Sequence, residues 1–481
     1  MKEQKNSKHN ILSSFIWKFG ERILAQVVSL VISIILARLL TPEDYGVVAL
    51  VMIFITIANV FVSSGLGNAL IQKKEVDNID FSSVFFVNII ISIIIYLILF
   101  ALAPTVANFF DMPAVCLIIR VLGLRIIIAA INSVQQAYVS RNMLFKKFFW
   151  STLGGTLVSG LLGVGMAYKG YGVWALVVQY LANTCVDTVI LWFTVRWRPE
   201  MKFSWLKAKG LISYGWKLLL SSLLDTGYRQ VRSLIIGKFY TSSDLAFYNQ
   251  GEKYPSLIVT NINTSIGSVI FPVMAQNQNN REEIKRLTRK VIRTSSYIMW
   301  PTMIGFSVCA ESLVRLILTE KWLPCVPYIS IFCLSYGFWP IHTANLQAIN
   351  AMGRSDIFLK LEIIKKTLGI ILLLFTIKQG PLAIALSLIV VDIISLFVNS
   401  YPNKNLLGYG YVEQIKDVIP TLLLTIAMAI IIYPIKYIIN FDWLIICTQV
   451  VFGIIVYLIL SLKTEQDVLK YFFDLLKQNK K

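Results

Sequence analysis

The 481-residue sequence has little charge: only 15% of its residues are charged, whereas 56% are hydrophobic. Soluble domains carry about 25% charged and roughly 45–50% apolar residues. One large core cannot account for the excess, because soluble chains of this length divide into domains joined by polar linkers. The composition excludes a disordered chain, a secreted disulfide scaffold and an ordinary soluble enzyme, and it indicates an integral membrane protein.

Residue types that build catalytic and metal sites are also scarce. The six cysteines lie scattered in apolar stretches without a Cys-x-x-Cys pair, which is typical of small core residues. His9 and His342 are the two histidines, too few for a metal site and a poor basis for a Ser-His-Asp triad. The chain also lacks a Walker A motif, so direct use of ATP is not expected. We therefore expect no enzyme, no catalytic residue, no metal and no organic cofactor, and the role of His342 stays open.

The positive charge of the chain has two explanations. Lys and Arg number 45 against 26 Asp and Glu, which gives a net charge of +19. In a soluble protein this excess would suggest a nucleic-acid partner. In a membrane protein Lys and Arg collect in cytoplasmic loops, and most loop cations here fall on one side when the N-terminus is placed in the cytoplasm. We therefore expect cytoplasmic termini, an even number of spans and no nucleic acid.

Long apolar segments dominate the chain. A membrane helix needs about 20 mostly apolar residues. The basic N-terminus precedes no small-residue cleavage site, so the first segment is expected to be retained. The connections are too short to hold a catalytic domain. The sequence thus predicts an all-α membrane protein with fourteen transmembrane helices at 12–39, 45–66, 82–108, 113–138, 148–168, 172–195, 211–237, 246–275, 291–318, 323–351, 356–377, 381–399, 416–438 and 443–462.

An internal repeat relates the two halves. The run ILARLLTPEDYG (35–46) aligns with IIGKFYTSSDLA (235–246), which pairs Thr41 with Thr241 and Asp44 with Asp244. A second similarity pairs Arg141 and the residues after it with Arg354 and those that follow. Six helices per half is an even number, so the halves share one orientation. This predicts a parallel repeat, and transporters built in this way bind substrate between the halves.

The repeat predicts the domain organisation. Residues 1–200 form an N-lobe of six helices, residues 201–402 a C-lobe of six helices, and residues 403–462 an appended helix pair. The tail, residues 463–481, alternates apolar residues and lysines at helical spacing. It is predicted to be an amphipathic helix on the cytoplasmic leaflet, with a packing cap on the bundle as the alternative.

Polar residues form stripes along three of the predicted helices. A charge at the bilayer centre costs roughly 2.5–3.5 kcal/mol, so each needs an explanation. Spacings of three and four residues place each set on one helix face. The stripes are Ser14, Lys18, Arg22, Gln26, Ser29 and Ser33; Tyr214, Lys217, Ser221, Asp225, Arg229 and Arg232; and Asn249, Lys253, Ser256, Thr260, Asn263 and Gly267.

Two interpretations of the intramembrane charges are open. Some cations snorkel to the interface or form ion pairs, which is favoured for Lys18, Arg315, Lys365 and Lys366 and is an alternative for Arg120 and Arg232. Asp187, Glu362 and Asp392 are interpreted as paired structural carboxylates. The remaining cations are predicted to line a water-filled cavity for an anionic substrate, in which Arg suits phosphate oxygens. They are Arg22, Lys217, Arg229, Lys253 and Arg125, with Glu21, Asp225 and Glu252 as charge partners or as sites for a coupling H⁺ or Na⁺.

Several segments carry a family resemblance. LARLLTPEDYGVVAL (36–50) followed by SGLGNALIQKKE (64–75) resembles the polysaccharide transporter family. This family belongs to the multidrug/oligosaccharidyl-lipid/polysaccharide flippase superfamily, which is MATE-like. GYGVWALVVQ (170–179) and LQAINAMGRSDIFLKLEIIKK (346–366) resemble the branch with teichuronic acid and lipopolysaccharide-type exporters.

The resemblance implies a function. Two six-helix lobes around a central cavity would flip polyprenyl-pyrophosphate-linked oligosaccharide from the cytoplasmic to the outer leaflet of a bacterial membrane, for surface polysaccharide synthesis. It implies that Arg22, Arg229 and Lys253 lie near the pyrophosphate, and that glycosyltransferases and a polymerase of the pathway are partners. A cation-coupled multidrug antiporter is the alternative, although a basic cavity argues against it. A membrane polymerase or ligase of lipid-linked glycans is a further alternative, but it would need a larger outer loop.

Overall fold

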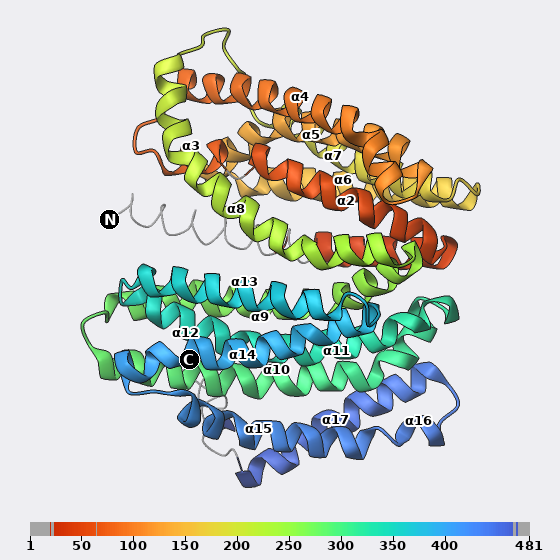
Figure 1. Ribbon diagram of the computed structural model, residues 1–481, viewed down its shortest axis with the longest axis vertical. Helices are drawn as coiled ribbons and strands as arrows, with labels where there is room; N and C mark the ends of the chain where they lie inside the picture. The colour runs from red at the N-terminus through yellow and green to blue at the C-terminus, as the bar shows by residue number, and fades with distance from the viewer. Residues whose placement is uncertain (1–19, 21–23, 64, 465–467, 470–481) are drawn as a thin grey trace. The chain divides into compact units, whose positions relative to one another are not determined.

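The protein is all-helical in the part that the structure describes. The computed structural model describes residues 20, 24–63, 65–464 and 468–469 (Figure 1). In these residues, ten helices are long and apolar enough to cross a membrane. Each of the fourteen predicted segments overlaps helical residues, although much of the first lies outside the described residues and the segment 323–351 is divided among a 3₁₀ turn and two helices. The prediction of a multi-pass helical membrane protein is therefore confirmed.

The helix bounds follow local sequence signals. Asp77 caps α4 through a reciprocal capping box with Asp80, while Pro113 and Pro381 occupy the first helical positions of α5 and α14. The helices after the segment 24–39 are α2 (Pro42–Ser63), α3 (Leu66–Gln72), α4 (Asn78–Phe109), α5 (Pro113–Arg141), α6 (Phe145–Tyr168), α7 (Val173–Thr194), α8 (Trp205–Phe239), α9 (Ser242–Gln276), α10 (Arg281–Ile317), η1 (Glu320–Cys325), α11 (Val326–Gly337), α12 (Trp339–Ala351), α13 (Ser355–Thr376), α14 (Pro381–Leu407), α15 (Tyr411–Ile432), α16 (Ile435–Ile438) and α17 (Asp442–Thr464).

Four predicted spans fall outside the set of ten. The described part of the first, Leu24–Leu39, is short, and α8, α9 and α13 do not reach the apolar content of the others. The physical reason is the polar stripes, because α8 and α9 carry two of them and α13 carries Lys365 and Glu362. The helices least typical of a lipid-facing span are thus those with intramembrane polar and charged residues.

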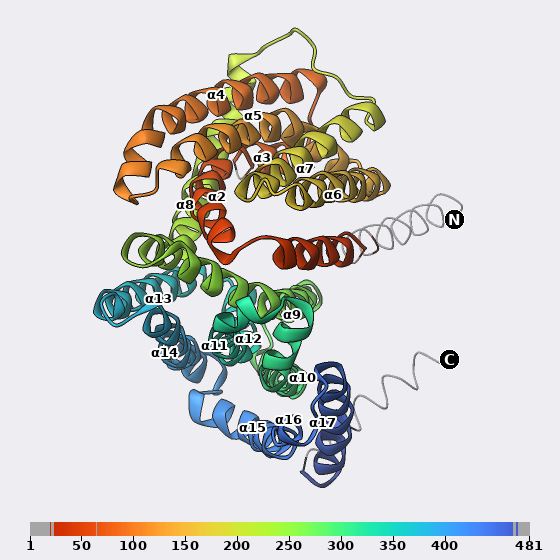
Figure 2. The same ribbon diagram turned by 90° about the vertical axis from the view of Figure 1, so that its right-hand side faces the viewer.

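The chain divides into two compact units, residues 1–246 and residues 247–481. In the first unit, α4 packs against α5 and α6 against α7, while α8 packs against α2, α3 and α4 (Figure 2). In the second unit, α10 packs against α11, α15 and α17, and α13 packs against α14. The predicted lobe boundary near residue 200 stays a prediction, and α8 belongs by its contacts to the first unit.

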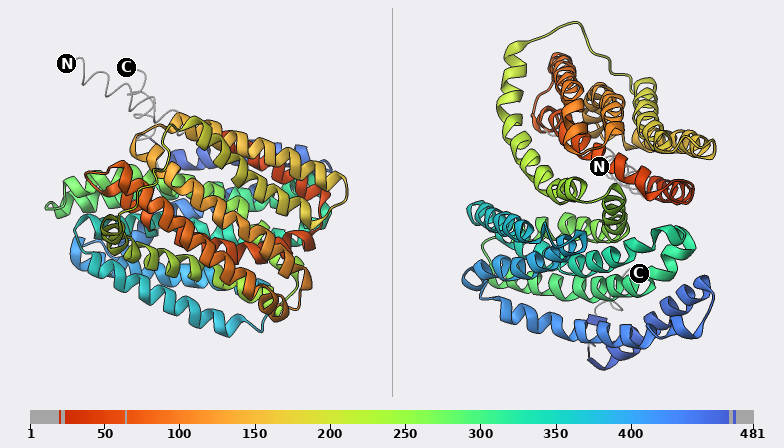
Figure 3. Two further views of the ribbon diagram at one scale, coloured as in Figure 1. Left: turned by 90° about the horizontal axis from the view of Figure 1, so that it is seen from above. Right: turned by 45° about the vertical axis from the view of Figure 1, so that its right-hand side comes forward.

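A long connection, residues 195–204, joins α7 to α8 across one end of the first unit (Figure 3). Trp197 anchors it, because its ring packs against Phe81, Phe85 and Tyr138 and its carbonyl accepts a hydrogen bond from Gln135 at 3.2 Å. The connection is therefore a fixed part of the unit.

Two local geometries recur in the two halves. Asp44 Oδ2 accepts hydrogen bonds from the amide and hydroxyl of Thr41 at 3.0 and 2.8 Å, ahead of α2. Asp244 makes the same pair of bonds with Thr241 at 3.1 and 2.7 Å, at the start of α9. The aligned runs 35–46 and 235–246 therefore share this hydrogen-bonded structure in both halves.

The second similarity between the halves, near Arg141 and Arg354, has a structural counterpart, but the sequence alignment predicted it in the wrong register. The turn after α5 has a left-handed residue, Met143, and the turn after α12 has Gly353 in that place. The amides of these two residues donate to Ser140 and Asn350, at 3.3 and 3.0 Å, three residues earlier in each turn. This geometry aligns Arg141 with Ala351, so the predicted match of Arg141 with Arg354 is wrong. The arginine side chains happened to repeat at a different spacing from the backbone.

Two residues of the C-terminal tail are described. Val468 and Leu469 are buried in a cluster with Tyr297, Leu424 and Met428 of the second unit. These two positions favour the packing-cap alternative, and the remaining apolar residues of the tail lie outside the described residues.

Candidate functional site

The stripe on α8 carries solvent-accessible charge in the middle of the helix. Lys217 is exposed, and Arg229 is 67% exposed. Asp225 Oδ2 lies 3.0 Å from Arg229 Nε, one helical turn away, so Asp225 is an ion-pair partner of Arg229. A mid-helix face with exposed cations and a partnered carboxylate can bind an anion without first breaking a buried ion pair.

Arg232 continues this stripe but is only 5% exposed. Its guanidinium carbon lies 5.8 Å from the centre of the Tyr228 ring. Its Nε and Nη2 atoms have no hydrogen-bond partner among the described residues, which leaves two buried donors available. Snorkelling does not describe this buried arginine, which joins the candidate site. Its helical spacing from Arg229 was the sequence signal.

Arg125, also predicted for the site, lies on α5. Its Nε donates to Thr184 Oγ1 at 2.7 Å, and its Nη1 lies 3.8 Å from Met52 Sδ. The guanidinium also lies 5.7 Å from the centre of the Tyr180 ring. These contacts come from α2 and α7, so they position Arg125 inside the helix bundle of the first unit. A ligand-binding role for Arg125 stays a prediction.

The other predicted site residues divide between the second unit and the part of the chain that is not described. Lys253 is half-buried on α9, and the neighbouring Glu252 accepts a hydrogen bond from the Tyr336 hydroxyl at 2.8 Å. Arg22 and Glu21 lie outside the described residues. The prediction that all these groups line one cavity therefore stays a prediction.

The charges that were expected to be structural have polar partners. Asp187 accepts a hydrogen bond from Asn132 at 2.7 Å inside the first unit. In the second unit, Lys365 pairs with Glu362 at 2.5 Å and Arg315 with Glu311 at 3.1 Å. The interpretation of these groups as paired is confirmed. Lys18 lies outside the described residues.

Charged side chains also tie α8 to the residues just before α4. Lys207 of α8 forms an ion pair with Asp77, and the hydrogen bond from Lys207 lowers the pKa of Asp77 to about 2. Lys73 pairs with Asp80 at 2.7 Å. Lys73 and Lys207 line a cavity of about 520 Å³ between α3 and α8, and both already have carboxylate partners.

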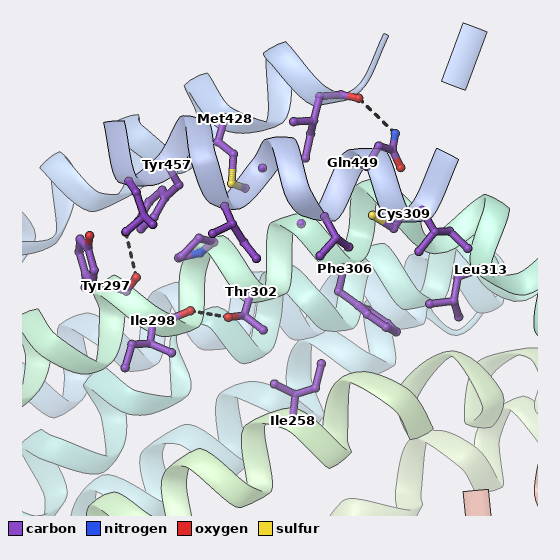
Figure 4. Close-up of a pocket in the computed structure, with 18 residues that line it drawn as sticks. Ile258, Tyr297, Ile298, Thr302, Phe306, Cys309, Leu313, Met428, Gln449 and Tyr457 are labelled. Atoms are coloured by element: carbon purple, nitrogen blue, oxygen red, sulfur yellow. Dashed lines mark hydrogen bonds between the residues drawn. The ribbon is translucent and has the colours of Figure 1, made fainter. Parts of the chain in front are cut away.

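An apolar pocket of about 440 Å³ lies between α10, α15 and α17 in the second unit (Figure 4). Ile298, Phe306 and Leu313 of α10 line one wall. Most polar groups of the lining bond internally: Gln449 Nε2 donates to the carbonyl of Ile432 at 3.2 Å, and the hydroxyls of Thr302 and Tyr457 donate to carbonyls of α10. Gln449 Oε1 is buried and has no hydrogen-bond partner among the described residues. The pocket therefore presents hydrocarbon surface, which suits an apolar chain.

The fold and these sites define a multi-pass membrane protein of the transporter type. A family model described as polysaccharide biosynthesis protein matches residues 35–327, more than half of the chain. The chain belongs to this polysaccharide biosynthesis family, as the resemblance predicted.

Curated relatives agree with this assignment. The chain is 20% identical to the lipopolysaccharide biosynthesis protein WzxC of Escherichia coli K12, over 88% of each chain. It is 23% identical to the succinoglycan biosynthesis transport protein ExoT of Rhizobium meliloti, over 67% of this chain and 65% of ExoT. It is 21% identical to the teichuronic acid biosynthesis protein TuaB of Bacillus subtilis, over 72% of each. The chain is therefore a polysaccharide biosynthesis transport protein and not an enzyme.

Solved structures share the fold. The lipid II flippase MurJ in an inward closed conformation superposes with a TM-score of 0.76, 16% identity and coverage of 94% of this chain and all of MurJ. An inward-facing MATE multidrug transporter of the MOP superfamily gives 0.58, with 11% identity, 86% of this chain and 98% of that chain. The MATE-like fold is thereby confirmed.

Proposed function

We propose that this protein flips polyprenyl-pyrophosphate-linked oligosaccharide from the cytoplasmic to the outer leaflet of a bacterial cytoplasmic membrane. The observation that carries the proposal is the cationic face of α8, where Lys217 and Arg229 are exposed and the buried Arg232 follows on the same face. A pyrophosphate is multiply anionic, and guanidinium groups bind its oxygens in a forked geometry. Membership in a family of polysaccharide biosynthesis transport proteins supplies the context for the saccharide.

The proposed architecture has fourteen spans, in two six-helix lobes with a parallel repeat and an appended pair. The matching Thr41–Asp44 and Thr241–Asp244 geometries support the repeat, since they cap helices in equivalent places of the two halves. In this architecture the substrate binds between the lobes, which rock to expose it on either side. Both termini lie in the cytoplasm, where glycosyltransferases supply the substrate, and a polymerase consumes it outside.

Binding of the head group follows from the charges on α8. An exposed ion pair such as Asp225–Arg229 contributes about 0–1 kcal/mol, so Arg229 exchanges its carboxylate for a phosphate oxygen at little cost. Arg232 contributes more binding free energy, because its two buried N–H donors without partners acquire phosphate oxygens as acceptors. The isoprenoid chain stays in apolar surroundings, and the pocket between α10, α15 and α17 offers it protein surface.

Ligand binding separates this proposal from a multidrug antiporter. Native mass spectrometry would compare a polyprenyl-pyrophosphate oligosaccharide with an organic-cation drug on wild type, on Lys217→Ala/Arg229→Ala and on Lys169→Ala. Lys169 is a matched control, an exposed cation in the turn between α6 and α7. We expect wild type and control to retain the pyrophosphate lipid and the double variant to lose it. Preferential binding of the drug would favour the antiporter.

A further inference from the structure

A largely buried imidazole faces a largely buried carboxylate within the second unit. His342 of α12 and Asp392 of α14 have side chains that are 12% and 15% exposed, and His342 Nε2 lies 3.9 Å from Asp392 Oδ1. Both residues lie inside candidate membrane spans. Ionisable residues in such segments are costly, and they commonly mark ion or proton pathways.

The contact with Asn399 determines which ring nitrogen of neutral His342 carries the proton. The Asn399 amide nitrogen lies 3.3 Å from His342 Nδ1. An amide nitrogen only donates, so Nδ1 accepts and the neutral ring carries its proton on Nε2, which faces Asp392. Asp392 also accepts a hydrogen bond from the Ser335 hydroxyl of α11. The pair therefore links α11, α12 and α14.

The site can accommodate a second proton on the ring. Asn399 Oδ1 is buried and has no hydrogen-bond partner among the described residues. Rotation of the amide by half a turn would bring Oδ1 to Nδ1 as an acceptor, so a protonated ring would donate to Asn399 and form an ion pair with Asp392, whose Oδ1 lies 3.9 Å from Nε2. Protonation of the Asp392 carboxyl is the other way for the pair to hold the same proton. With it the pair is neutral, and without it the pair carries one negative charge.

Other titratable groups surround the pair. Lys365 of α13, paired with Glu362, is the charge that acts on His342. Tyr336 of α11, bonded to Glu252 of α9, feels the field of Asp392. Charged or titratable groups on the surrounding helices include Tyr248, Glu252 and Lys253 of α9, Tyr336 of α11, and Lys360, Glu362, Lys365 and Lys366 of α13. They also include Tyr297, Cys309 and Glu311 of α10, which packs against α12 and α14.

We propose that the His342–Asp392 pair binds the proton whose passage drives transport. This inference rests on the proposed transport function and names its coupling ion. A neutral imidazole is a proton acceptor, whereas Na⁺ prefers oxygen ligands, so the donor set favours H⁺. Gain or loss of one charge between packed helices changes how α12 and α14 hold together, and this couples protonation to conformation.

Gradient-driven transport tests the proposal. Proteoliposomes with wild type, His342→Gln or Asp392→Asn would move a labelled polyprenyl-pyrophosphate oligosaccharide under a pH gradient, a Na⁺ gradient or none. His9→Gln, which removes the other histidine, is the matched control. We expect the pH gradient to accelerate wild type and the control several-fold, and the two pair variants to move substrate at one rate with or without it. Stimulation retained in both variants, or driven by Na⁺ alone, would overturn the proposal.

A second measurement observes protonation directly in the protein with the pair intact. In the His9→Gln protein His342 is the sole imidazole, so isotope-labelled histidine gives a single-residue signal in infrared difference spectra. We expect acidification to protonate the ring or the Asp392 carboxyl, which labelled aspartate and Asp392→Asn would assign. If neither group changes over the pH range in which transport depends on pH, the pair is not the coupling site. If the spectra titrate but wild type moves no substrate, the proposed function fails instead.

Discussion

Replacement of Gly46, in the TPEDYG segment at the start of α2, is predicted to lower stability even when the new residue is alanine. A methyl group at this position would lie 1.8 Å from the carbonyl oxygen of Ser242 and 2.3 Å from its carbonyl carbon. Carbon and oxygen atoms approach to about 3.3 Å at closest, so the backbones of α2 and α9 would have to separate by roughly 1.5 Å. Since both offending atoms belong to backbone, no side chain can rotate away.

The free energy of this change has two opposing contributions. Overpacking costs about 1–3 kcal/mol, and a backbone clash belongs at the upper end. Alanine regains about 1 kcal/mol of helix propensity over glycine. We therefore expect Gly46→Ala to lower the free energy of unfolding by about 2 kcal/mol, which corresponds to a fall in melting temperature of roughly 4–8 °C for a unit of this size.

Thermal melting of detergent-purified protein, followed by size-exclusion chromatography, measures this effect. Gly165→Ala in α6 is the matched control, because a Cβ there would meet no atom within 4 Å. We expect the control to melt at or slightly above the wild-type temperature. A Gly46→Ala protein that melts as high as Gly165→Ala would refute the argument that the Gly46 and Ser242 backbones leave no room for a methyl group.

Three further changes test separate features. Asp225→Asn releases Arg229 from its ion pair, so we expect tighter binding of a pyrophosphate lipid in a titration, and weaker binding would contradict the assigned exchange. Lys207→Ala removes the partner that lowers the pKa of Asp77 to about 2. An Asp77 pKa that is lower in the folded state stabilises the fold at pH values above the unfolded pKa of about 3.9, and this stabilisation is lost as the pH falls towards 2. The difference in melting temperature between Lys207→Ala and wild type should therefore be constant near neutral pH and vanish in acid. The Arg141 guanidinium donates to the four carbonyl oxygens of residues 70, 71, 73 and 74. One ammonium group cannot replace all four bonds, so Arg141→Lys should lower the free energy of unfolding by about 1–3 kcal/mol in thermal melts. An unchanged melting temperature would show that these bonds are dispensable.

Much of the fold was predictable because it depends on local patterns. Apolar length located most of the helices, and the Thr41–Asp44 and Thr241–Asp244 boxes are visible in sequence as repeated capping signals. The register of the second similarity was not predictable, since it depends on backbone turns at Met143 and Gly353 that different side chains can adopt. Side-chain similarity near Arg141 and Arg354 was therefore a misleading guide.

The candidate site was harder to predict from the sequence than the fold. Helical spacing placed Arg229 and Arg232 on one face, but it could not show that one is exposed and the other buried. Nor could it show that Arg125 meets Thr184, because that contact joins residues of two different helices. The pairing of His342 with Asp392 could not be predicted either, since only tertiary packing brings α12 and α14 together.

The central claim is that the protein moves a lipid-linked pyrophosphate saccharide between leaflets by means of the α8 cations. A leaflet assay in proteoliposomes tests it most directly: a fluorescent polyprenyl-pyrophosphate oligosaccharide is placed in one leaflet and its appearance in the other is followed. Wild type and Lys169→Ala should translocate it, while Arg229→Ala/Arg232→Ala, at equal protein level, should fall to the rate of empty vesicles. Full translocation by the double variant would contradict the site, and no translocation by folded wild type across several glycans and ion gradients would contradict the function.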